Sequence, residues 1–201
     1  MKKYVSIIIS LIPLNAGRIF LYNNLFGYNI SYSSKIGMFS VITARTVTIT
    51  KSIIGSFNRL TGDFDLVIEE GANIGNFNEF KLIANKVGLS YCKIGKNVHI
   101  TNGHFFDASG GITIKELTRI AGRSSQFWTH GGQRKQHAIT INEKCYIGSA
   151  VMVAQGVQIA ENSFVGLGSI VIDSFDEANV LIAGNPARIV KRDIVARRSL
   201  L

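Results

Sequence analysis

The stretch 141–171 decides the fold, and divided into sixes it reads INEKCY IGSAVM VAQGVQ IAENSF VGLGSI V. A branched aliphatic residue opens every group without a miss. These opening residues are Ile141, Ile147, Val153, Ile159, Val165 and Val171. The fourth residue after each opening residue is small, and these residues are Cys145, Val151, Val157, Ser163 and Ser169. A period of six fits neither an α-helix nor a simple alternating strand.

The same period extends towards the N-terminus. It runs through Ile30, Ile36, Ile42, Thr48 and Ile54, and shorter stretches repeat it at Ile68, Ile74 and Phe80, at Ile94 and Ile100, and at Ile114 and Ile120. The period makes sense if each group of six forms one flat side of a prism, with the branched residue inside. Three sides make a coil of about 18 residues, and stacked coils pair as parallel strands. We therefore predict an all-β fold, a parallel β-helix, rather than a sandwich with turns every 8–12 residues or so.

The repeat divides the chain into three parts. We expect a helical N-terminal cap over residues 1–29, the β-helix over 30–172 with a loop excursion near 127–138, and a C-terminal segment over 173–201. In the first part, Leu14 to Leu25 fits a short amphipathic helix. The apolar run from Val5 to Leu11 follows two lysines but is too short to span a membrane and lacks a good cleavage site. We favour a cap over the open end of the β-helix. The alternative is peripheral contact with the inner membrane face, aided by Lys2, Lys3 and Arg18.

Composition sets the remaining bounds. The 201 residues suit one domain, and 46% hydrophobic against 17% charged residues is typical of a globular protein. The formal net charge of +9 allows an anionic partner, which could be nucleic acid, a membrane surface or a phosphorylated small molecule. Cys92 and Cys145 are too few for a disulfide scaffold. We therefore expect a reducing, cytoplasmic setting.

Three C-terminal motifs carry a family resemblance. They are IGSA at 147–150, VGLGSIV at 165–171 and AGNPAR at 183–188. They resemble the ending of the hexapeptide-repeat acyltransferases, and in particular of the galactoside, maltose and polysaccharide O-acetyltransferases. The resemblance covers most of the chain from about Ile30 onward. It implies a left-handed β-helix, although the general rule for parallel crossovers would give the opposite hand. It also implies a homotrimeric acyltransferase with active sites between neighbouring subunits.

The last break in the repeat, FWTHGGQRKQHA at 127–138, holds two of the four histidines. His130 matches the family's catalytic histidine, which ends a coil just before an excursion loop. Acyl transfer from a thioester to a sugar hydroxyl needs a base near neutrality, and imidazole suits that task. The resemblance therefore predicts His130 as the general base. Without the repeat around it, a surface histidine on a loop would be the better interpretation.

The break at 101–111 resembles a family segment one coil earlier, where an Asn or Asp binds the acceptor or orients the histidine. Asn102 and Asp107 both match, and the sequence leaves the choice between them open. A carboxylate or amide that holds Nδ1–H would leave Nε2 free as the base. Trp128, His104 and His137 are further candidates for contact with the acceptor. For His104, an exposed side chain on a strand edge is the interpretation that we favour.

The resemblance implies acetyl-coenzyme A as co-substrate, whose phosphates account for part of the positive charge. Gly148, Ser149 and Gly166 match the coenzyme-binding corners, with the Ser149 backbone N–H as donor to the oxyanion. Arg188 and Lys191 match positions near the coenzyme phosphates, and Arg192 is adjacent. One departure is the sequence VIDS at 171–174, where many relatives have Val-Thr-Lys-Asp. A lysine that helps to bind the coenzyme is therefore missing.

Two other functions compete with acyl transfer. One is a metalloenzyme resembling the γ-class carbonic anhydrases, for which His104, His130 and His137 are the only plausible ligands. Their spacing does not match that family, so we expect no metal. The other is a non-enzymatic structural or nucleic-acid-binding subunit, but the chain lacks interleaved basic and aromatic residues. We therefore predict an acetyl-CoA-dependent O-acetyltransferase that acts on a sugar of a surface polysaccharide or its precursor. The sequence leaves open the sugar, the hydroxyl, an amine acceptor and a longer acyl group.

Overall fold

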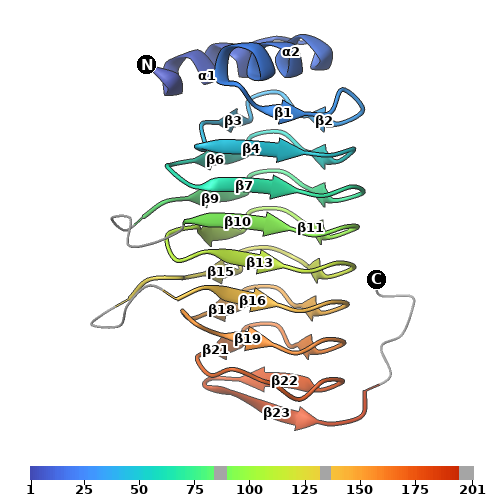
Figure 1. The fold of residues 1–201 in the computed structure, drawn as a ribbon. Helices are drawn as coiled ribbons and strands as arrows, with labels where there is room; N and C mark the ends of the chain where they lie inside the picture. The colour runs from blue at the N-terminus through green and yellow to red at the C-terminus, as the bar shows by residue number, and fades with distance from the viewer. Residues whose placement is uncertain (84–89, 132–136, 195–201) are drawn as a thin grey trace.

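A computed structural model describes residues 1–83, 90–131 and 137–194 of the chain. Two helices, α1 (Lys2–Leu11) and α2 (Asn15–Phe26), lie across one end of a tall stack of short strands (Figure 1). The strands form three parallel sheets, which we call A, B and C, and every coil contributes one strand to each sheet in turn. This order is typical of a left-handed β-helix and confirms the predicted fold.

The strands are two to five residues long among the described residues. Sheet A contains β1 (Asn29–Ile30), β4 (Thr46–Ile49), β7 (Asp65–Ile68), β10 (Tyr91–Ile94), β13 (Ile112–Ile114), β16 (Ile139–Ile141) and β19 (Gln158–Ile159). Sheet B contains β2 (Lys35–Ile36), β5 (Ile53–Ile54), β8 (Asn73–Ile74), β11 (His99–Ile100), β14 (Arg119–Ile120), β17 (Tyr146–Ile147), β20 (Phe164–Val165), β22 (Leu181–Gly184) and β23 (Ala187–Lys191). Sheet C contains β3 (Val41–Ile42), β6 (Arg59–Thr61), β9 (Glu79–Lys81), β12 (Phe105–Asp107), β15 (Gln126–Phe127), β18 (Met152–Val153) and β21 (Ile170–Val171).

The interior of the prism is filled by the residues that open each group of six. Ile141, Ile147 and Val153 are at most 1% exposed, and each stands beside its counterpart in the next coil. In sheet C, Phe80, Phe106 and Phe127 stack face to face with centroids 4.4 and 4.8 Å apart. Such offset stacking adds to the gain from burial. Cys145 is buried on the inner face as a core residue, and burial raises the pKa of its thiol to about 12.

The count of six slips once near the N-terminus. Thr48 was predicted to face inward, but Val47 and Ile49 are the buried residues of β4 and Thr48 is half-buried between them. The turn between β3 and β4 contains one residue more than the plain repeat allows. Because side chains alternate along a strand, one added residue moves the neighbouring side chain inward.

Four longer turns occur at one place, between a strand of sheet C and the next strand of sheet A, which we call the C–A corner. They follow β6, β9, β12 and β15 in successive coils. The turn between sheets B and C, which we call the B–C corner, stays short in comparison. Loops that leave a rigid scaffold often carry function, so the C–A corner is where a site is expected.

The two ends of the prism are closed differently. The α1 and α2 helices cover the first coil, with Ser6 donating to the carbonyl of Ile42 and Arg18 to the carbonyl of Ile36. At the other end, β22 pairs with β20, and β23 turns back antiparallel to β22 through a cis Asn185–Pro186 bond. In the part of the chain that the structure describes, neither helix has the length and apolar character needed to cross a bilayer.

Candidate functional site

His130 lies at the C–A corner, three residues beyond the end of β15. The register of sheet C explains which residue it meets. Phe106 of β12 stands beside Phe127 of β15, so the next residue, Asp107, lies at the same corner one coil earlier. Nδ1 of His130 is 2.6 Å from Oδ2 of Asp107. The structure therefore brings together His130 and Asp107, which were two of the three predicted catalytic residues.

The Asp107 carboxylate is held on every side. Its Oδ1 accepts hydrogen bonds from the backbone N–H and the hydroxyl of Ser109, at 3.0 and 2.5 Å. Its Oδ2 accepts from the backbone N–H of Thr129 at 3.0 Å and lies 2.9 Å from the Thr129 hydroxyl. The carboxyl is completely buried, whereas the His130 side chain is 28% exposed. Asp107 is thus a rigid partner beneath a histidine that faces solvent.

The pKa of Asp107 follows from these contacts. Burial by itself raises the pKa of the carboxyl, but hydrogen bonds from His130, Ser109 and Thr129 outweigh burial and hold the pKa below its ordinary value. Asp107 is therefore an anion at neutral pH. An anionic acceptor at Nδ1 fixes the proton of a neutral imidazole on Nδ1, which leaves Nε2 to take a proton from a substrate.

The local sequence allows this close approach. Asp107 accepts a hydrogen bond from the backbone N–H of Ser109, two residues ahead, as Asp residues in turns often do. The same carboxylate therefore stabilises its own turn and holds His130. Gly110 follows, and its N–H donates to the Thr129 hydroxyl at 2.8 Å. A Cβ at Gly110 would stand 2.8 Å from the Thr129 carbonyl oxygen. A larger residue would therefore push the two coils apart where Asp107 and His130 meet.

An aromatic surface borders the histidine. Trp128 packs on Phe105 with centroids 4.7 Å apart and meets the His130 ring edge-on at 5.8 Å. The indole N–H of Trp128 donates to Gln126, which fixes the orientation of the ring. Both aromatic rings are half-buried. Trp128, a predicted acceptor contact, therefore lies beside His130 and Asp107.

His104 has a different position from the one expected. It is 1% exposed, at the B–C corner, so the predictions of an exposed side chain and of contact with the acceptor are both corrected. Its Nδ1 accepts from the Ser125 backbone N–H at 3.2 Å, and Nε2 lies 3.0 Å from the Thr101 hydroxyl. Burial lowers the pKa of His104 to about 4. The imidazole is thus a neutral part of the core.

Asn102 lies at the same B–C corner. Its carboxamide oxygen accepts from the backbone N–H of Asn76 in the preceding coil, at 2.6 Å. Asn102 therefore links two turns of the prism and does not contact His130. Of the two residues between which the sequence could not choose, the structure brings only Asp107 to the histidine.

The three glycine and serine residues predicted to bind the coenzyme also lie at the B–C corner. Gly148 and Ser149 follow β17, and Gly166 follows β20 in the next coil. The Ser149 hydroxyl accepts from the Arg123 N–H and donates to the Arg123 carbonyl, both at 3.0 Å. Because strands of sheet C begin at the B–C corner and end at the C–A corner, Ser149 and His130 lie at opposite edges of this sheet. One chain alone does not bring them together.

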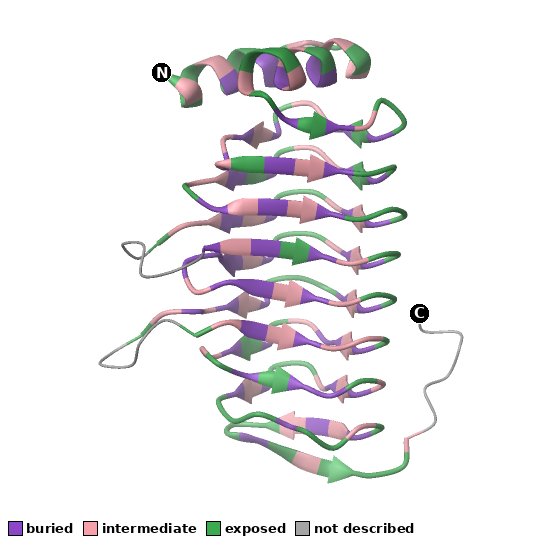
Figure 2. Cartoon of the chain, in the orientation of Figure 1, coloured by how far each residue is buried: buried purple, intermediate pink, exposed green. Residues whose placement is uncertain are grey.

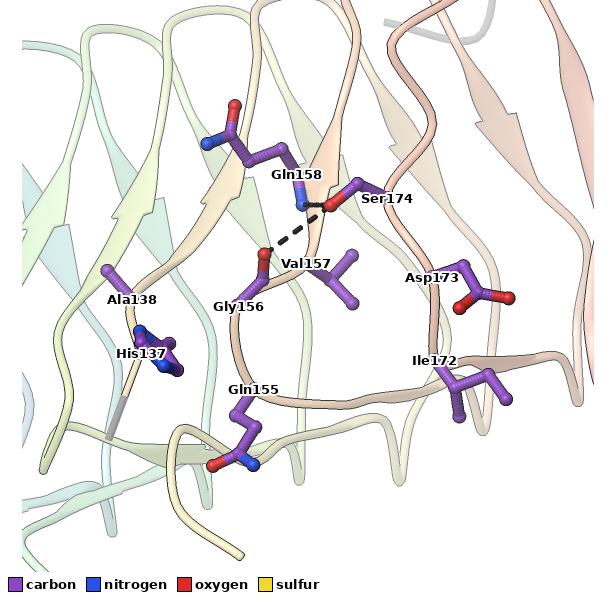
Figure 3. Close-up of a pocket in the computed structure, with 9 residues that line it drawn as sticks. All are labelled: His137, Ala138, Gln155, Gly156, Val157, Gln158, Ile172, Asp173 and Ser174. Atoms are coloured by element: carbon purple, nitrogen blue, oxygen red, sulfur yellow. Dashed lines mark hydrogen bonds between the residues drawn. The ribbon is translucent and has the colours of Figure 1, made fainter. Parts of the chain in front are cut away.

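A pocket opens at the C–A corner on the C-terminal side of His130 (Figure 3). It is lined by His137, Ala138, Gln155, Gly156, Val157, Gln158, Ile172, Asp173 and Ser174. Gln155 was not singled out in the sequence, and no pattern there marks it. Its Nε2 donates to the Gly131 carbonyl, whereas its Oε1 is buried without a hydrogen-bond partner among the described residues. A buried acceptor of this kind fits a ligand that brings an N–H donor.

The predicted basic residues lie at the C-terminal end of the prism. Arg188 pairs with Asp173 of the pocket at 3.2 Å, and Arg192 pairs with Glu177 at 2.9 Å. Lys191 is exposed on the same strand, β23. Arg188 therefore contacts a residue that lines the pocket. Lys191 and Arg192 are near Arg188 in sequence, but neither is paired with a lining residue in the part of the chain that the structure describes.

The three histidines of the rival metal site do not meet within one chain. Within residues 1–83, 90–131 and 137–194, no group of three or more His, Cys, Asp and Glu side chains is placed to hold a metal ion. His104 is enclosed in the core, away from the exposed His137.

No model of a known protein family matches the chain. The galactoside O-acetyltransferase of Escherichia coli (strain K12) is 40% identical over 98 residues, which are 49% of this chain and 42% of that protein. A candidate acetyltransferase of colanic acid biosynthesis from the same strain is 41% identical over 91 residues, which are 42% of this chain and 50% of that protein. The chain spans about half the length of these relatives.

Similarity in structure extends further along the chain. A hexapeptide-repeat-containing acetyltransferase of Vibrio cholerae superposes with a TM-score of 0.54 at 19% identity, over 96% of this chain and 89% of that one. At this identity the likeness concerns the fold. The repeat in the sequence, the three-sided fold and the sequence relatives agree, and the chain is a homologue of the hexapeptide-repeat acetyltransferases.

Proposed function

We propose that the chain is an O-acetyltransferase that transfers an acetyl group from acetyl-coenzyme A directly to a sugar hydroxyl. The observation that carries this proposal is the 2.6 Å contact between His130 and the buried Asp107 carboxylate. This contact lies at the C–A corner, where the longer turns interrupt the repeat. The names of the galactoside and colanic acid relatives support a sugar acceptor.

The chemistry follows from the two nitrogens of His130. Nε2 takes the proton of the acceptor hydroxyl as its oxygen attacks the thioester carbon. The carbon–sulfur bond then breaks, and the imidazolium returns the proton to the leaving thiolate. Asp107 keeps the ring oriented and stabilises the imidazolium without taking the proton itself. No covalent enzyme intermediate is required, because the acceptor attacks directly.

The pocket beside His130 is the proposed place for the coenzyme arm. Gly156 and Ser174 line this pocket, and the buried Gln155 Oε1 has no hydrogen-bond partner among the described residues. A chain with amide N–H groups ending in a thioester would satisfy that acceptor and lead towards His130. Arg188 adds positive charge next to this pocket, suited to phosphate at the far end.

The oxyanion donor is proposed to come from a second copy of the chain. Ser149 and His130 are separated by the width of sheet C, so a site that contains both needs the B–C corner of one subunit against the C–A corner of another. Three copies around an axis close such contacts without leaving one open. We therefore propose a homotrimer in which each active site lies between neighbours.

The acceptor is proposed to be a sugar of a surface polysaccharide or its precursor. The Trp128 ring lies beside the His130 ring, and Phe105 packs on Trp128. An aromatic face next to a few convergent polar groups is common in small-molecule sites. A pyranose ring that packs on this surface would hold one hydroxyl near the base.

Calorimetry with acetyl-coenzyme A, followed by an assay of released thiol with panels of sugars, tests the proposal. Wild type and His130→Ala should bind the coenzyme equally, and only wild type should release thiol faster when an acceptor is added. Absence of coenzyme binding by wild type at low salt would refute the proposed donor. Equal turnover by His130→Ala would refute the proposed base.

A further inference from the structure

The helical cap exposes several large apolar side chains on its outer side. Tyr4, Ile8 and Leu11 of α1 follow the spacing i, i+4, i+7, and all three are more than half exposed. Leu14 and Phe20 are also more than half exposed, on the link and on α2. A helix at the surface of a water-soluble protein normally turns its polar side outward.

The inward side of the cap carries polar residues beside the buried Ile9, Ile19 and Tyr22. Ser6 and Ser10 of α1 are buried, and Ser6 donates to the Ile42 carbonyl while contacting the Tyr22 hydroxyl at 2.9 Å. Arg18 of α2 is also buried and donates to the Ile36 carbonyl. These groups satisfy the open edge of the first coil, which explains why the polar residues point inward. That need does not explain why the outward side is apolar.

Both helices lie flat across the end of the prism, and exposed residues occur along each of them (Figure 2). Contacts of Ser6 with β3 and of Arg18 with β2 show that the two helices rest on different sides of the same coil. Their outer sides therefore face away from the prism together. An apolar end surface of this breadth marks a docking site.

Charge identifies what docks there. The two helices carry Lys2, Lys3 and Arg18 and no Asp or Glu, so the cap has a net positive charge. Lys3 is exposed on α1 beside the apolar surface. Two copies of the chain placed end to end would bring these positive charges together, which disfavours a second copy as the partner. Apolar side chains beside positive charge are suited to the surface of an anionic lipid bilayer.

We infer that the outer side of α1 and α2 binds the surface of an anionic membrane, with Tyr4, Ile8, Leu11, Leu14 and Phe20 entering the headgroup region. The helices lie on the bilayer and do not cross it. The long axis of the prism then stands upright on the membrane. This surface is independent of the catalytic proposal, since neither His130 nor the coenzyme pocket takes part in it.

Sedimentation of the full chain with vesicles tests this inference. The vesicles contain phosphatidylcholine alone or phosphatidylcholine with phosphatidylglycerol. Wild type should bind the anionic vesicles, and high salt should weaken binding because it screens the charge. The variant Ile8→Ser/Leu11→Ser should bind at least about tenfold more weakly, since two apolar side chains no longer enter the bilayer.

The matched control is Ile53→Ser/Leu117→Ser, which removes two exposed apolar side chains from the wall of the prism. It should bind within about twofold of wild type, and thermal unfolding should show that both variants fold. Lack of binding by wild type to anionic vesicles would overturn the inference, as would equal binding by the cap variant. Light scattering provides the remaining arm: a doubled mass that disappears in the cap variant would make a second copy the partner.

Discussion

The two corners that border sheet C each hold a histidine, and they treat it in opposite ways. At the B–C corner, His104 occupies an inward position, is 1% exposed, and has both ring nitrogens engaged by Ser125 and Thr101. At the C–A corner, His130 stands beyond the end of its strand, with one nitrogen on a buried carboxylate. The comparison shows that a side chain's place in the coil, rather than its type, decides between packing and chemistry.

His104 is buried because it belongs to a row of inward-facing polar residues that runs along the B–C corner. In successive coils the inward position is taken by Ser40, Asn58, Asn78, His104 and Ser125, each of which hydrogen-bonds the main chain of a neighbouring coil. His104 is one member of that row. The C–A corner also holds buried polar residues such as Thr129, but its longer turns continue beyond them and present His130 towards solvent.

Asp107→Asn should produce the largest effect on the C–A corner. An amide can donate to Nδ1, which would place the imidazole proton on the wrong nitrogen, so we expect kcat to fall at least about 100-fold. The KM for acetyl-coenzyme A should change little. Steady-state kinetics checks this, with Asp63→Asn, an exposed carboxylate two coils earlier, as the control. A kcat near that of wild type would remove Asp107 from the mechanism.

His104→Asn should change stability and leave turnover intact. His104 has a folded pKa of about 4 against an ordinary 6.5, so the unfolded chain binds the extra proton and stability falls as pH drops from 6.5 towards 4. That loss amounts to about 3 kcal/mol. Asn serves the same position in two earlier coils, so the variant should fold and lose this pH dependence. Urea unfolding at several pH values measures it.

Titration of Asp107 does not overlap with the pH dependence of stability that is expected from His104. Its folded pKa is lowered, so the stability that it contributes is present above its unfolded pKa and is lost only when the pH falls through the folded value. That window lies below the His104 window. An unchanged slope between pH 6.5 and 4 in His104→Asn would mean that His104 is not a buried neutral imidazole.

Arg188→Ala should weaken coenzyme binding by roughly three- to tenfold, because an exposed charge-assisted contact to phosphate is lost. Asp173→Ala removes the partner of Arg188 and one negative charge from the pocket. It should bind the coenzyme at least as tightly as wild type. Calorimetry at two salt concentrations compares the two variants, and similar losses in both would indicate a structural role for the pair.

Ser149→Ala should have the smallest effect. The backbone N–H proposed for the oxyanion is retained, so turnover should stay within about twofold of wild type. The hydroxyl links Ser149 to Arg123 by two hydrogen bonds, and their loss should cost about 1 kcal/mol of unfolding free energy. Kinetics and urea unfolding of the same sample separate these effects. A large fall in kcat would show that the hydroxyl itself acts.

The sequence predicted the fold well because the inward position of each side is filled by a branched aliphatic residue or, in three coils of sheet C, by phenylalanine. It failed at Thr48, where one added residue in the preceding turn is invisible to a count of six. His130 was predicted as the base from the family resemblance and from the break in the repeat, and this role stays a prediction. The sequence could not choose between Asn102 and Asp107 as the partner of His130, because the two residues are close in sequence. They lie at different corners because β12 begins after Asn102 and ends at Asp107.

The remaining differences concern orientation. His104 was expected at an exposed edge, but the short turn at Asn102 and Gly103 returns the chain inward just at residue 104. Gln155 belongs to an ordinary hexad, and its orphaned acceptor is visible only in three dimensions. The apolar run from Val5 to Leu11 is evident in sequence, whereas the direction in which its apolar side points depends on the hydrogen bonds that Ser6 makes to the first coil.

Because the coils are regularly stacked, the number of strands between two points of the prism gives the distance between them. Four steps of sheet C separate β3, next to the helices, from β15, next to His130. At about 4.8 Å for each step and about 10 Å for the helical layer, the base stands roughly 30 Å above the plane on which the helices rest. If that plane is a bilayer, a sugar attached directly to its lipid carrier lies too low to be modified. The enzyme would then act on glycans that have already grown several units away from the membrane, which makes acetylation a late step in chain assembly.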